Sequence, residues 1–449
     1  MFGLADEAEV EALEQELAAA GDAPAATRAD LELTLAFIRL RNGAIDEAVS
    51  LGEAAADHFD QAGESSGVSS SLMLLVAAHS EADDRERSAA TIEQLLALPG
   101  LSDGRRARAL EYRARLHGGA DDFVAGAADA DETCRILATI GAHTALAQSN
   151  ILAAMLHEDA GAAAEAVVRY RAGVRTLEGN GVPTTALRFK LGRAMLAAGD
   201  AEEAAELLHT VYSEETDADE APASRAQTLM QLARACEGAE QWGNALWAWG
   251  TAAELAESDD AAPMAASALV HRGRLLLGLG DPGEAVESLD AGVTIARQHP
   301  DQLGLLTDAI HTLGRARLAN GDESGFALLD EVAALAQEHE ATWLFADVTD
   351  SRGRALAQAG RLDDGVRELL SASDAFIAVG DVGAAGGAEL FAARSLVAAD
   401  RQADAVAVFG SILDRDGGPD GLRRVAALEL GDALEALGRH GEAAEAIDG

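Results

Sequence analysis

The chain has 449 residues, of which 77 are Asp or Glu and 34 are Lys or Arg, so its formal net charge is −43. A negative field of this size repels nucleic acid and anionic membrane surfaces, which excludes both as expected partners. Lys190 is the only lysine, and the acidic, alanine-rich, arginine-rich composition favours a salt-adapted or high-GC bacterial source.

The N-terminus, Met1 to Val10, is acidic and lacks a long apolar run, so no secretory signal is predicted. An amphipathic helix is predicted over residues 4 to 20, ending at Gly21. Its apolar side chains near one face are Leu4, Ala8, Leu13 and Leu17. We expect residues 1–24 to be an N-terminal capping helix, because a repeat stack needs a cover for its first open face.

From residue 36 onward, three positions recur: a small residue, a turn-forming residue seven later, and a second small residue twelve later. The eleven copies are Ala36/Gly43/Ala48, Ala77/Asp84/Ala89, Ala114/Asp121/Gly126, Ala154/Gly161/Ala166, Gly192/Gly199/Ala204, Ala233/Glu240/Ala245, Gly273/Gly280/Ala285, Gly314/Gly321/Phe326, Gly353/Gly360/Gly365, Ala393/Asp400/Ala405 and Gly431/Gly438/Ala443. The first small residues lie a mean of 39.5 residues apart. A period of this length predicts a solenoid of stacked units.

Each copy predicts a helix, a turn and a second helix. In the copy at 192, apolar residues recur at helical spacing before the turn (Leu187, Leu191, Met195) and after it (Ala205, Leu208). The turn glycine suits a left-handed helix end, and the small residues allow close approach of the helices. Of the eight prolines, seven fall between copies and Pro282 falls in a turn, so none interrupts a predicted helix.

These copies resemble a long-period variant of the tetratricopeptide repeat family over roughly residues 29 to 449. On first helices the matching residues are Leu191-Gly192, Leu232-Ala233, Leu313-Gly314 and Leu430-Gly431. In the turn and at the start of the second helix they are Gly199-Asp200 with Glu203-Ala204, Gly280-Asp281 with Glu284-Ala285, and Glu442-Ala443. The family's early Trp and late Pro are missing. The resemblance implies an all-α, right-handed α-solenoid of about eleven stacked helix-turn-helix repeats, with residues 25–449 as one continuous domain and a short last repeat.

Sequence features that suggest chemistry are few. Gly278 to Gly283 has the spacing of a dinucleotide-binding motif, but a predicted helix precedes it where that motif needs a strand, so no cofactor is expected. The eleven histidines show no metal-binding spacing and no catalytic set stands out, so we expect no enzyme. Cys134 and Cys236 are predicted to be buried thiols, Trp249 a core residue and Trp247 an exposed anchor.

Arginine immediately follows the first small residue in seven of the eleven copies, far more often than composition predicts. We call this place the ladder position; its arginines are Arg115, Arg193, Arg234, Arg274, Arg315, Arg354 and Arg394. The family resemblance implies that it lines a concave groove. One interpretation makes the arginines structural, paired within their helices with Glu111, Glu237 and Asp350 or across repeats. The other makes them a receptor for an acidic or C-terminal carboxylate peptide.

Phe189, Lys190, Gln227, Gln231 and His271 are expected to share this groove. Asp308, Asp347 and Asp350 would oppose an acidic ligand, so the predicted site centres on the copies at 192, 233 and 273. The sequence thus predicts a soluble, cytoplasmic, non-enzymatic protein interaction scaffold that binds a protein segment, with acidic segments among its candidates. The alternative is a signal-responsive regulatory module that changes superhelix shape on binding a peptide or small effector. The short last repeat leaves an uncapped edge, which we expect to be covered by a partner, by another copy of the chain through self-association, or by further sequence.

Overall fold

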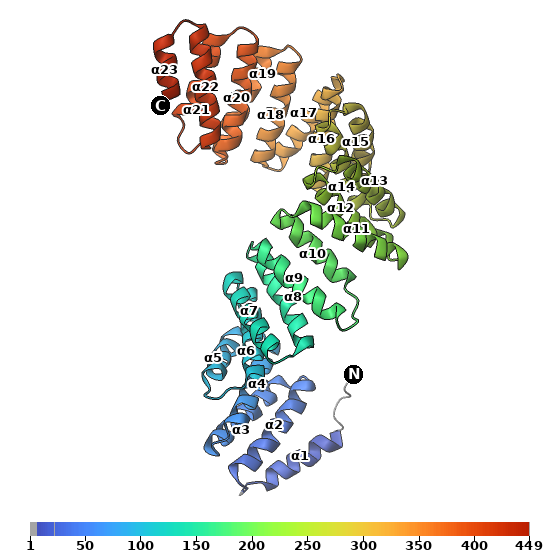
Figure 1. Ribbon diagram of the computed structural model, residues 1–449, viewed down its shortest axis with the longest axis vertical. Coiled ribbons are helices and arrows are strands. Elements are labelled where there is room, and N and C mark those ends of the chain that lie inside the picture. The colour runs from blue at the N-terminus through green and yellow to red at the C-terminus, as the bar shows by residue number, and fades with distance from the viewer. Residues whose placement is uncertain (1–6, 22, 449) are drawn as a thin grey trace. The chain divides into compact units, whose positions relative to one another are not determined.

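The computed structural model describes residues 7–21 and 23–448, and within them every regular element is an α-helix (Figure 1). Eleven helical hairpins follow α1 in order, from α2–α3 to α22–α23, each holding one of the predicted copies. The predicted all-α repeat solenoid is therefore confirmed. The chain groups into two compact units, Met1–Glu215 and Thr216–Gly449, which are described separately below. That residues 25–449 form one domain stays a prediction.

The first unit contains the N-terminal helix and five hairpins. Its helices are α1 Glu7–Ala19, α2 Ala25–Arg41, α3 Ile45–Gln61, α4 Ser65–Glu81, α5 Arg85–Ala97, α6 Asp103–Gly119, α7 Phe123–Thr139, α8 His143–Asp159, α9 Ala163–Glu178, α10 Thr185–Ala198 and α11 Ala201–Asp217. Helix α1 packs on α2, with Val10 buried and Leu13 and Leu17 half-buried. Leu4 of the predicted capping helix lies outside the described residues.

The second unit contains six hairpins. Its helices are α12 Pro222–Gly238, α13 Trp242–Ser258, α14 Ala262–Gly278, α15 Pro282–Ala296, α16 Leu303–Ala319, α17 Ser324–Glu338, α18 Thr342–Gln358, α19 Leu362–Ala378, α20 Val382–Ala398, α21 Gln402–Asp414, α22 Asp420–Ala436 and α23 His440–Asp448. The dinucleotide-like stretch from Gly278 to Gly283 joins α14 to α15, so a helix precedes it, as predicted.

The hairpin turns use left-handed backbone at the predicted turn residue in ten of eleven copies. Gly199 has φ of +91°, and even Glu240 has φ of +57°. In the copy at 77 the prediction was wrong, because Asp83 rather than Asp84 takes this conformation, with φ of +53°. Asp84 instead caps the N-terminus of α5, and its side chain accepts a hydrogen bond from the Arg87 amide at 3.0 Å.

The small residues mark the points where the two helices of a hairpin cross. A Cβ atom on Gly273 would lie 2.4 Å from Leu289 Cγ, which is fully buried in the core between α14, α15 and α16. A Cβ atom on Gly365 would lie 2.6 Å from the backbone nitrogen of Ala357. The small residues therefore recur at fixed spacing because the helices approach too closely there for larger side chains.

The stretch from Ser213 to Ser224 has the acidic, Pro-containing composition typical of a connector loop, but most of it is helical, so a loop assignment from composition is wrong. Helix α11 continues to Asp217 and α12 begins at Pro222, which leaves only residues 218–221 between them. The acidic residues favour the helix because Glu214 accepts hydrogen bonds from Arg188 Nη2 at 2.7 Å and Thr185 Oγ1 at 3.0 Å on α10. Composition alone suggested a loop, but these contacts hold the helix.

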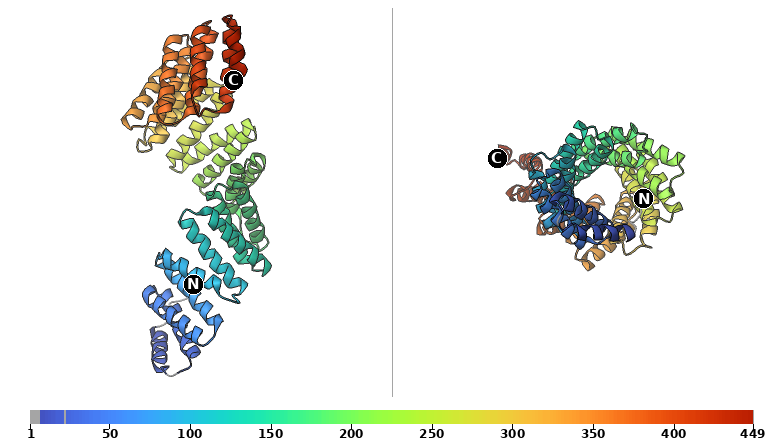
Figure 2. Two further views of the ribbon diagram at one scale, coloured as in Figure 1. Left: turned by 90° about the vertical axis from the view of Figure 1, so that its left-hand side faces the viewer. Right: turned by 90° about the horizontal axis from the view of Figure 1, so that it is seen from below.

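Several first helices of neighbouring hairpins touch one another directly. Successive hairpins lie side by side within each unit (Figure 2). Among the first helices, contacts join α2 to α4 and α4 to α6, and then α14 to α16, α16 to α18, α18 to α20 and α20 to α22. No pair of second helices in the described part of the chain is in comparable contact. A stack whose first helices lie closer together than its second helices curves toward the first helices. We therefore call the exposed side of the first helices, on the inside of this curve, the inner surface of each unit.

Candidate binding surface

Side chains at four positions of each first helix, spaced i, i+3, i+4 and i+7, lie on one helix face. In α16 these are Asp308, His311, Thr312 and Arg315, and in α18 they are Asp347, Asp350, Ser351 and Arg354. Polar contacts between these positions cross from one first helix to the next: Arg274 to Asp308, His311 to Ser351, and Arg394 to Glu429. The inner surface of the second unit is thus polar and charged, unlike the apolar hairpin cores.

Four of the seven ladder arginines bind carboxylates. Arg115 contacts Glu111 at 2.9 Å, and Arg354 contacts Asp350 at 2.6 Å, both within one helix as the structural interpretation predicted. Arg274 reaches Asp308 on the next first helix at 2.6 Å. Arg394 Nε and Nη2 both donate to Glu429 on the next first helix, the shortest contact being 2.6 Å. These four arginines therefore have the carboxylate partners that the structural interpretation predicted.

The other three, Arg193, Arg234 and Arg315, are exposed, and no described carboxylate oxygen lies within 4.0 Å of their guanidinium nitrogens. The predicted pairing of Arg234 with Glu237 was wrong. Glu237 instead accepts a hydrogen bond at 2.5 Å from Nε1 of Trp249, whose ring is fully buried, as predicted for that tryptophan. Core packing thus removes the partner that helical spacing offers to Arg234.

His271 is less available than predicted. Its ring stacks on Trp249 with the centroids 4.6 Å apart and the planes 9° from parallel. Burial, helped by Arg274 and Arg234, lowers the pKa of His271 to about 4. The imidazole is therefore neutral near pH 7 and adds no positive charge to the surface, and its place in a binding groove stays a prediction.

The remaining predicted groove residues divide between the two units. Phe189 and Lys190 are half-buried on α10 in the first unit, where Arg193 also lies. Gln231 is half-buried on α12 in the second unit, with Arg234 one turn further along the helix. A single site centred on the copies at 192, 233 and 273 stays a prediction.

A polar cluster joins α16 to α18. His311 is 7% exposed, its Nε2 lies 2.9 Å from Ser351 Oγ, and its pKa is lowered to about 4 by burial and then by Arg315. Asp347 Oδ2 lies 3.5 Å from His311 Nδ1, and no described Lys or Arg nitrogen lies within 4.0 Å of this carboxylate. Burial, and then the neighbouring Asp350, raise the pKa of Asp347. A carboxylate with no described Arg or Lys partner thus lies in the same cluster as the exposed Arg315.

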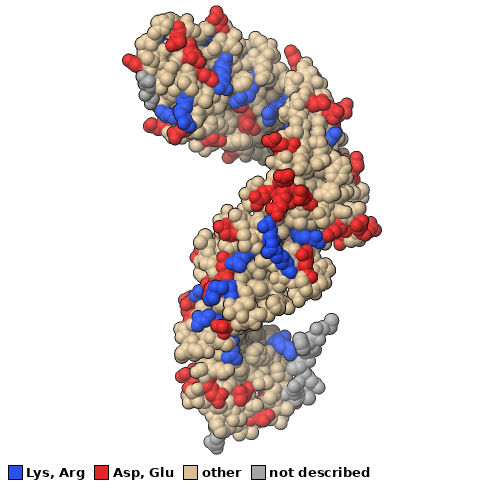
Figure 3. Space-filling model, in the orientation of Figure 1, with Lys and Arg blue, Asp and Glu red and all other residues tan. Residues whose placement is uncertain are grey.

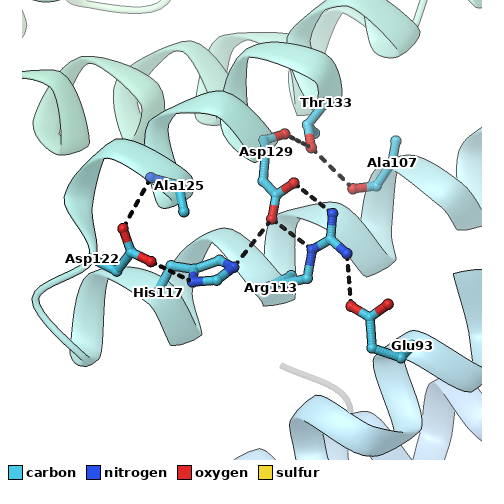
Figure 4. A network of polar contacts seen from close by, with 8 residues as sticks. All are labelled: Glu93, Ala107, Arg113, His117, Asp122, Ala125, Asp129 and Thr133. Atoms are coloured by element: carbon cyan, nitrogen blue, oxygen red, sulfur yellow. Dashed lines mark hydrogen bonds and ion pairs between the residues drawn. The ribbon is translucent and has the colours of Figure 1, made fainter.

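The opposite side of a first helix uses arginine differently, as Figure 4 shows for α6. Arg113 Nε and Nη2 donate to Asp129 on α7 at 2.7 and 2.8 Å, and Nη1 donates to Glu93 on α5 at 2.7 Å. His117 lies between Asp122 and Asp129, at 3.6 and 3.8 Å. Arg113 thus ties first and second helices together, whereas Arg115, two residues along, points to the exposed surface.

Two cavities occupy equivalent places in the two units. In the second unit a cavity of about 310 Å³ lies between α20, α21 and α22. In the first unit a cavity of about 220 Å³ lies between α4, α5 and α6. Each is bounded by the end of one first helix, the start of its second helix and the ladder position of the next first helix, where Asp432 and Arg115 stand. Sequence reasoning missed both.

Charges of both signs lie side by side on the visible face of α18–α22 (Figure 3). Cys134 and Cys236 are buried free thiols, as predicted, and burial raises the pKa of Cys134 to about 11. The described residues contain no group of three or more His, Cys, Asp or Glu side chains placed to hold a metal ion. None of the described helices combines the length and apolar composition of a membrane span.

Comparison with family models and with curated proteins found no match. Among solved structures, the chain is similar to aspartyl phosphate phosphatase F from Bacillus subtilis, with TM-score 0.49 and 13% identity over 92% of this chain and 95% of that one. It is also similar to the apo quorum sensor NprR from B. thuringiensis, with TM-score 0.47 and 11% identity over 85% and 97%. A third is a signal transduction ATPase with a tetratricopeptide repeat sensor from Pyrococcus horikoshii, with TM-score 0.46 and 14% identity over 81% and 52%.

Proposed function

Because its hairpins are tetratricopeptide-like repeats, we propose that this chain is a non-enzymatic scaffold that binds a segment of another protein along the inner surface. Five consecutive first helices of the second unit, α12 to α20, carry a guanidinium group at the ladder position. Arg274, Arg354 and Arg394 have structural partners. Arg234 and Arg315 do not, although a stack that needed arginine only for stability would pair them.

Arg234 and Arg315 are the observation that carries this proposal. Both are exposed on the inner surface, and their planar guanidinium groups can each donate two parallel hydrogen bonds to a carboxylate or several to backbone carbonyls. Arg234 also lies close enough to His271 to lower its pKa, so the two residues share one part of the surface. A protein segment lying across the first helices would meet these donors in turn.

The segment we propose carries charges of both signs. The net charge of −43 opposes the approach of a strongly acidic segment over long range. On the surface itself, Asp347, which has no described Arg or Lys partner, shares a cluster with Arg315, and Asp350 has one oxygen that is buried without a hydrogen-bond partner. Acidic groups of the segment would contact Arg234 and Arg315, whereas a continuous acidic run would also face these aspartates.

The test is photo-crosslinking in the native cell, since a single lysine makes amine-reactive cross-linkers uninformative. A photoreactive amino acid replaces exposed Gln227 on the first helix α12, or exposed Glu287 on the second helix α15 as the control position. We expect a discrete cross-linked partner from position 227 only. Capture at both positions alike, or at neither, contradicts binding along the inner surface.

The arginines are then tested with two variants of equal charge change. Arg234→Gln/Arg315→Gln should lose most of the partner cross-linked at 227, and the remaining binding should depend less on salt. Arg297→Gln/Arg367→Gln, which alters exposed arginines at the end of α15 and on α19, should retain it. Equal capture by both folded variants would refute the role of the ladder arginines. The regulatory alternative predicts in addition a change in solution scattering when the partner binds.

A further inference from the structure

The charge at the ladder position changes from positive to negative at α22, the first helix of the hairpin α22–α23. Helices α12, α14, α16, α18 and α20 carry arginine there, but α22 carries Asp432, directly after its crossing residue Gly431. Asp432 is exposed, and no described Arg, Lys or His nitrogen lies within 4.0 Å of its carboxylate. This change of sign coincides with the cavity of about 310 Å³ between α20, α21 and α22.

The cavity combines an apolar interior with a charged rim. Phe409 on α21 is fully buried, and Val397 on α20 and Ala433 and Ala436 on α22 line the remaining apolar walls. Val397 is 37% exposed and Ala436 is exposed, so this apolar surface is open to a ligand. The rim is formed by Arg394, Glu429 and Asp432.

The rim favours a cation over an anion. Arg394 is occupied, since its Nε and Nη2 donate to Glu429 at 2.9 and 2.6 Å, and these hydrogen bonds raise the pKa of Arg394. An incoming carboxylate would have to displace Glu429 and then face Asp432. With Arg394 and Glu429 neutralising each other, the rim carries the single uncompensated charge of Asp432. The overall charge of −43 favours the same sign of ligand.

We propose that this cavity binds a lysine side chain of the partner segment, an inference that rests on the proposed function. The aliphatic stem would lie against Val397, Ala398 and Ala436, and the ammonium group would reach Asp432 at the rim. Long cationic side chains bury their methylene groups along apolar surface while the charge remains at its edge. The ammonium has three donors and so can contact Asp432 and the outer face of Glu429 together.

The equivalent cavity in the first unit has different chemistry. There Arg115 stands at the ladder position in place of Asp432, and Tyr112 stands in place of Glu429. Arg85, Asp83 and Asp84 complete a rim of mixed charge. The stacking of hairpins thus opens a cavity at the same place in both units. The residue at the ladder position determines whether that cavity favours a positively or a negatively charged ligand side chain.

The experiment uses the full chain with Nα-acetyl-lysine methylamide as the probe and Nα-acetyl-norleucine methylamide as its uncharged match. Binding is followed by NMR of the methyl signals of Ala433 and Ala436 in alanine-labelled protein. We expect both signals to shift with the lysine probe, and Asp432→Asn to weaken its binding about three- to fivefold, as for loss of one exposed ion pair. The control Glu435→Gln neutralises an exposed carboxylate on the same helix outside the cavity and should change nothing.

A second variant tests the apolar part. Ala436→Leu replaces an exposed residue, so the fold should persist while the larger side chain fills the cavity and abolishes binding of the lysine probe. The proposal is overturned if the lysine and norleucine probes bind equally to the natural chain, if Asp432→Asn has no effect, or if neither probe shifts these signals. If the probe binds as expected but no partner is captured at position 227, the proposed function fails while the cavity is shown to be a cation site.

Discussion

The ion pair between Glu389 and Arg415 offers the sharpest test of how the second unit is held together. Glu389 on α20 is 4% exposed, and its carboxylate accepts hydrogen bonds from Arg415 Nη1 and Nη2 at 2.9 and 2.5 Å and from Ser373 Oγ at 2.9 Å. Arg415 lies at the end of α21, and its carbonyl accepts a hydrogen bond from Arg423 on α22 at 2.6 Å. The pair therefore fixes the connector that joins α21 to α22.

Substituting Glu389→Gln removes the charge but keeps the shape. Breaking a fully buried ion pair from one side costs about 3 to 5 kcal/mol, because the other charge is left uncompensated. The Arg415 side chain is 19% exposed, and the glutamine oxygen can still accept a hydrogen bond. We therefore expect a loss of about 2 to 3 kcal/mol, close to the cost of a broken hydrogen bond to a charged group.

Hydrogen exchange measured by mass spectrometry, together with urea denaturation, checks this magnitude. A loss of about 2 kcal/mol should speed exchange of protected amides in α20–α22 about 30-fold, with little change in α12–α14, because hairpins stabilise mainly their neighbours. The double variant Glu389→Leu/Arg415→Met removes both charges and should recover most of the stability. A single variant within about 0.5 kcal/mol of the natural chain, or a double variant no more stable than the single one, would refute the reasoning.

Three further substitutions test the electrostatics and the packing of the second unit. The raised pKa of Asp347 means that the folded state disfavours its charge, so its contribution to stability falls as pH rises from the unfolded value of 3.8 through the higher folded value. Asp347→Asn should thus stabilise the chain by about 0.5 to 1 kcal/mol at pH 7 and by almost nothing below about pH 3.5 in urea denaturation, and an equal gain at both pH values would contradict this. Gly365→Ala should cost about 2 to 3 kcal/mol, since the new Cβ would lie 2.6 Å from the Ala357 nitrogen. Gly410→Ala, with nothing within 4 Å, should gain about 0.5 to 1 kcal/mol in the same assay, and equal effects of the two would refute the close-contact account.

The hairpins could be predicted because close helix crossings require a small residue at a fixed place in the sequence. Gly273 faces Leu289 so closely that no other side chain fits without movement, and Gly192 and Gly353 meet a leucine of their second helix in the same way. The stretch from Ser213 to Ser224 was misassigned because its composition suggests a loop, whereas Glu214 is bound by Arg188 and Thr185 on another helix. Composition does not contain that contact.

The partners of the ladder arginines were predictable only within a helix. Arg115 and Arg354 bind carboxylates four residues before them, as helical spacing allows. Arg274 and Arg394 bind residues 34 and 35 positions later, and that choice depends on the register between hairpins. The cavity beside α22 was also missed, although the aspartate at its ladder position was a visible signal of a change in chemistry.

The ladder position has a consequence for how such a chain can change through evolution. The side chain there lies beside the helix crossing but outside the hairpin core, so the crossing residue can conserve the fold while its neighbour varies. In the first unit this place holds exposed Phe37 and Met155 as well as arginines, and in the second it ends with an aspartate. Single substitutions at the ladder position could therefore change the charge and polarity of the inner surface while leaving the stability of the stack nearly constant.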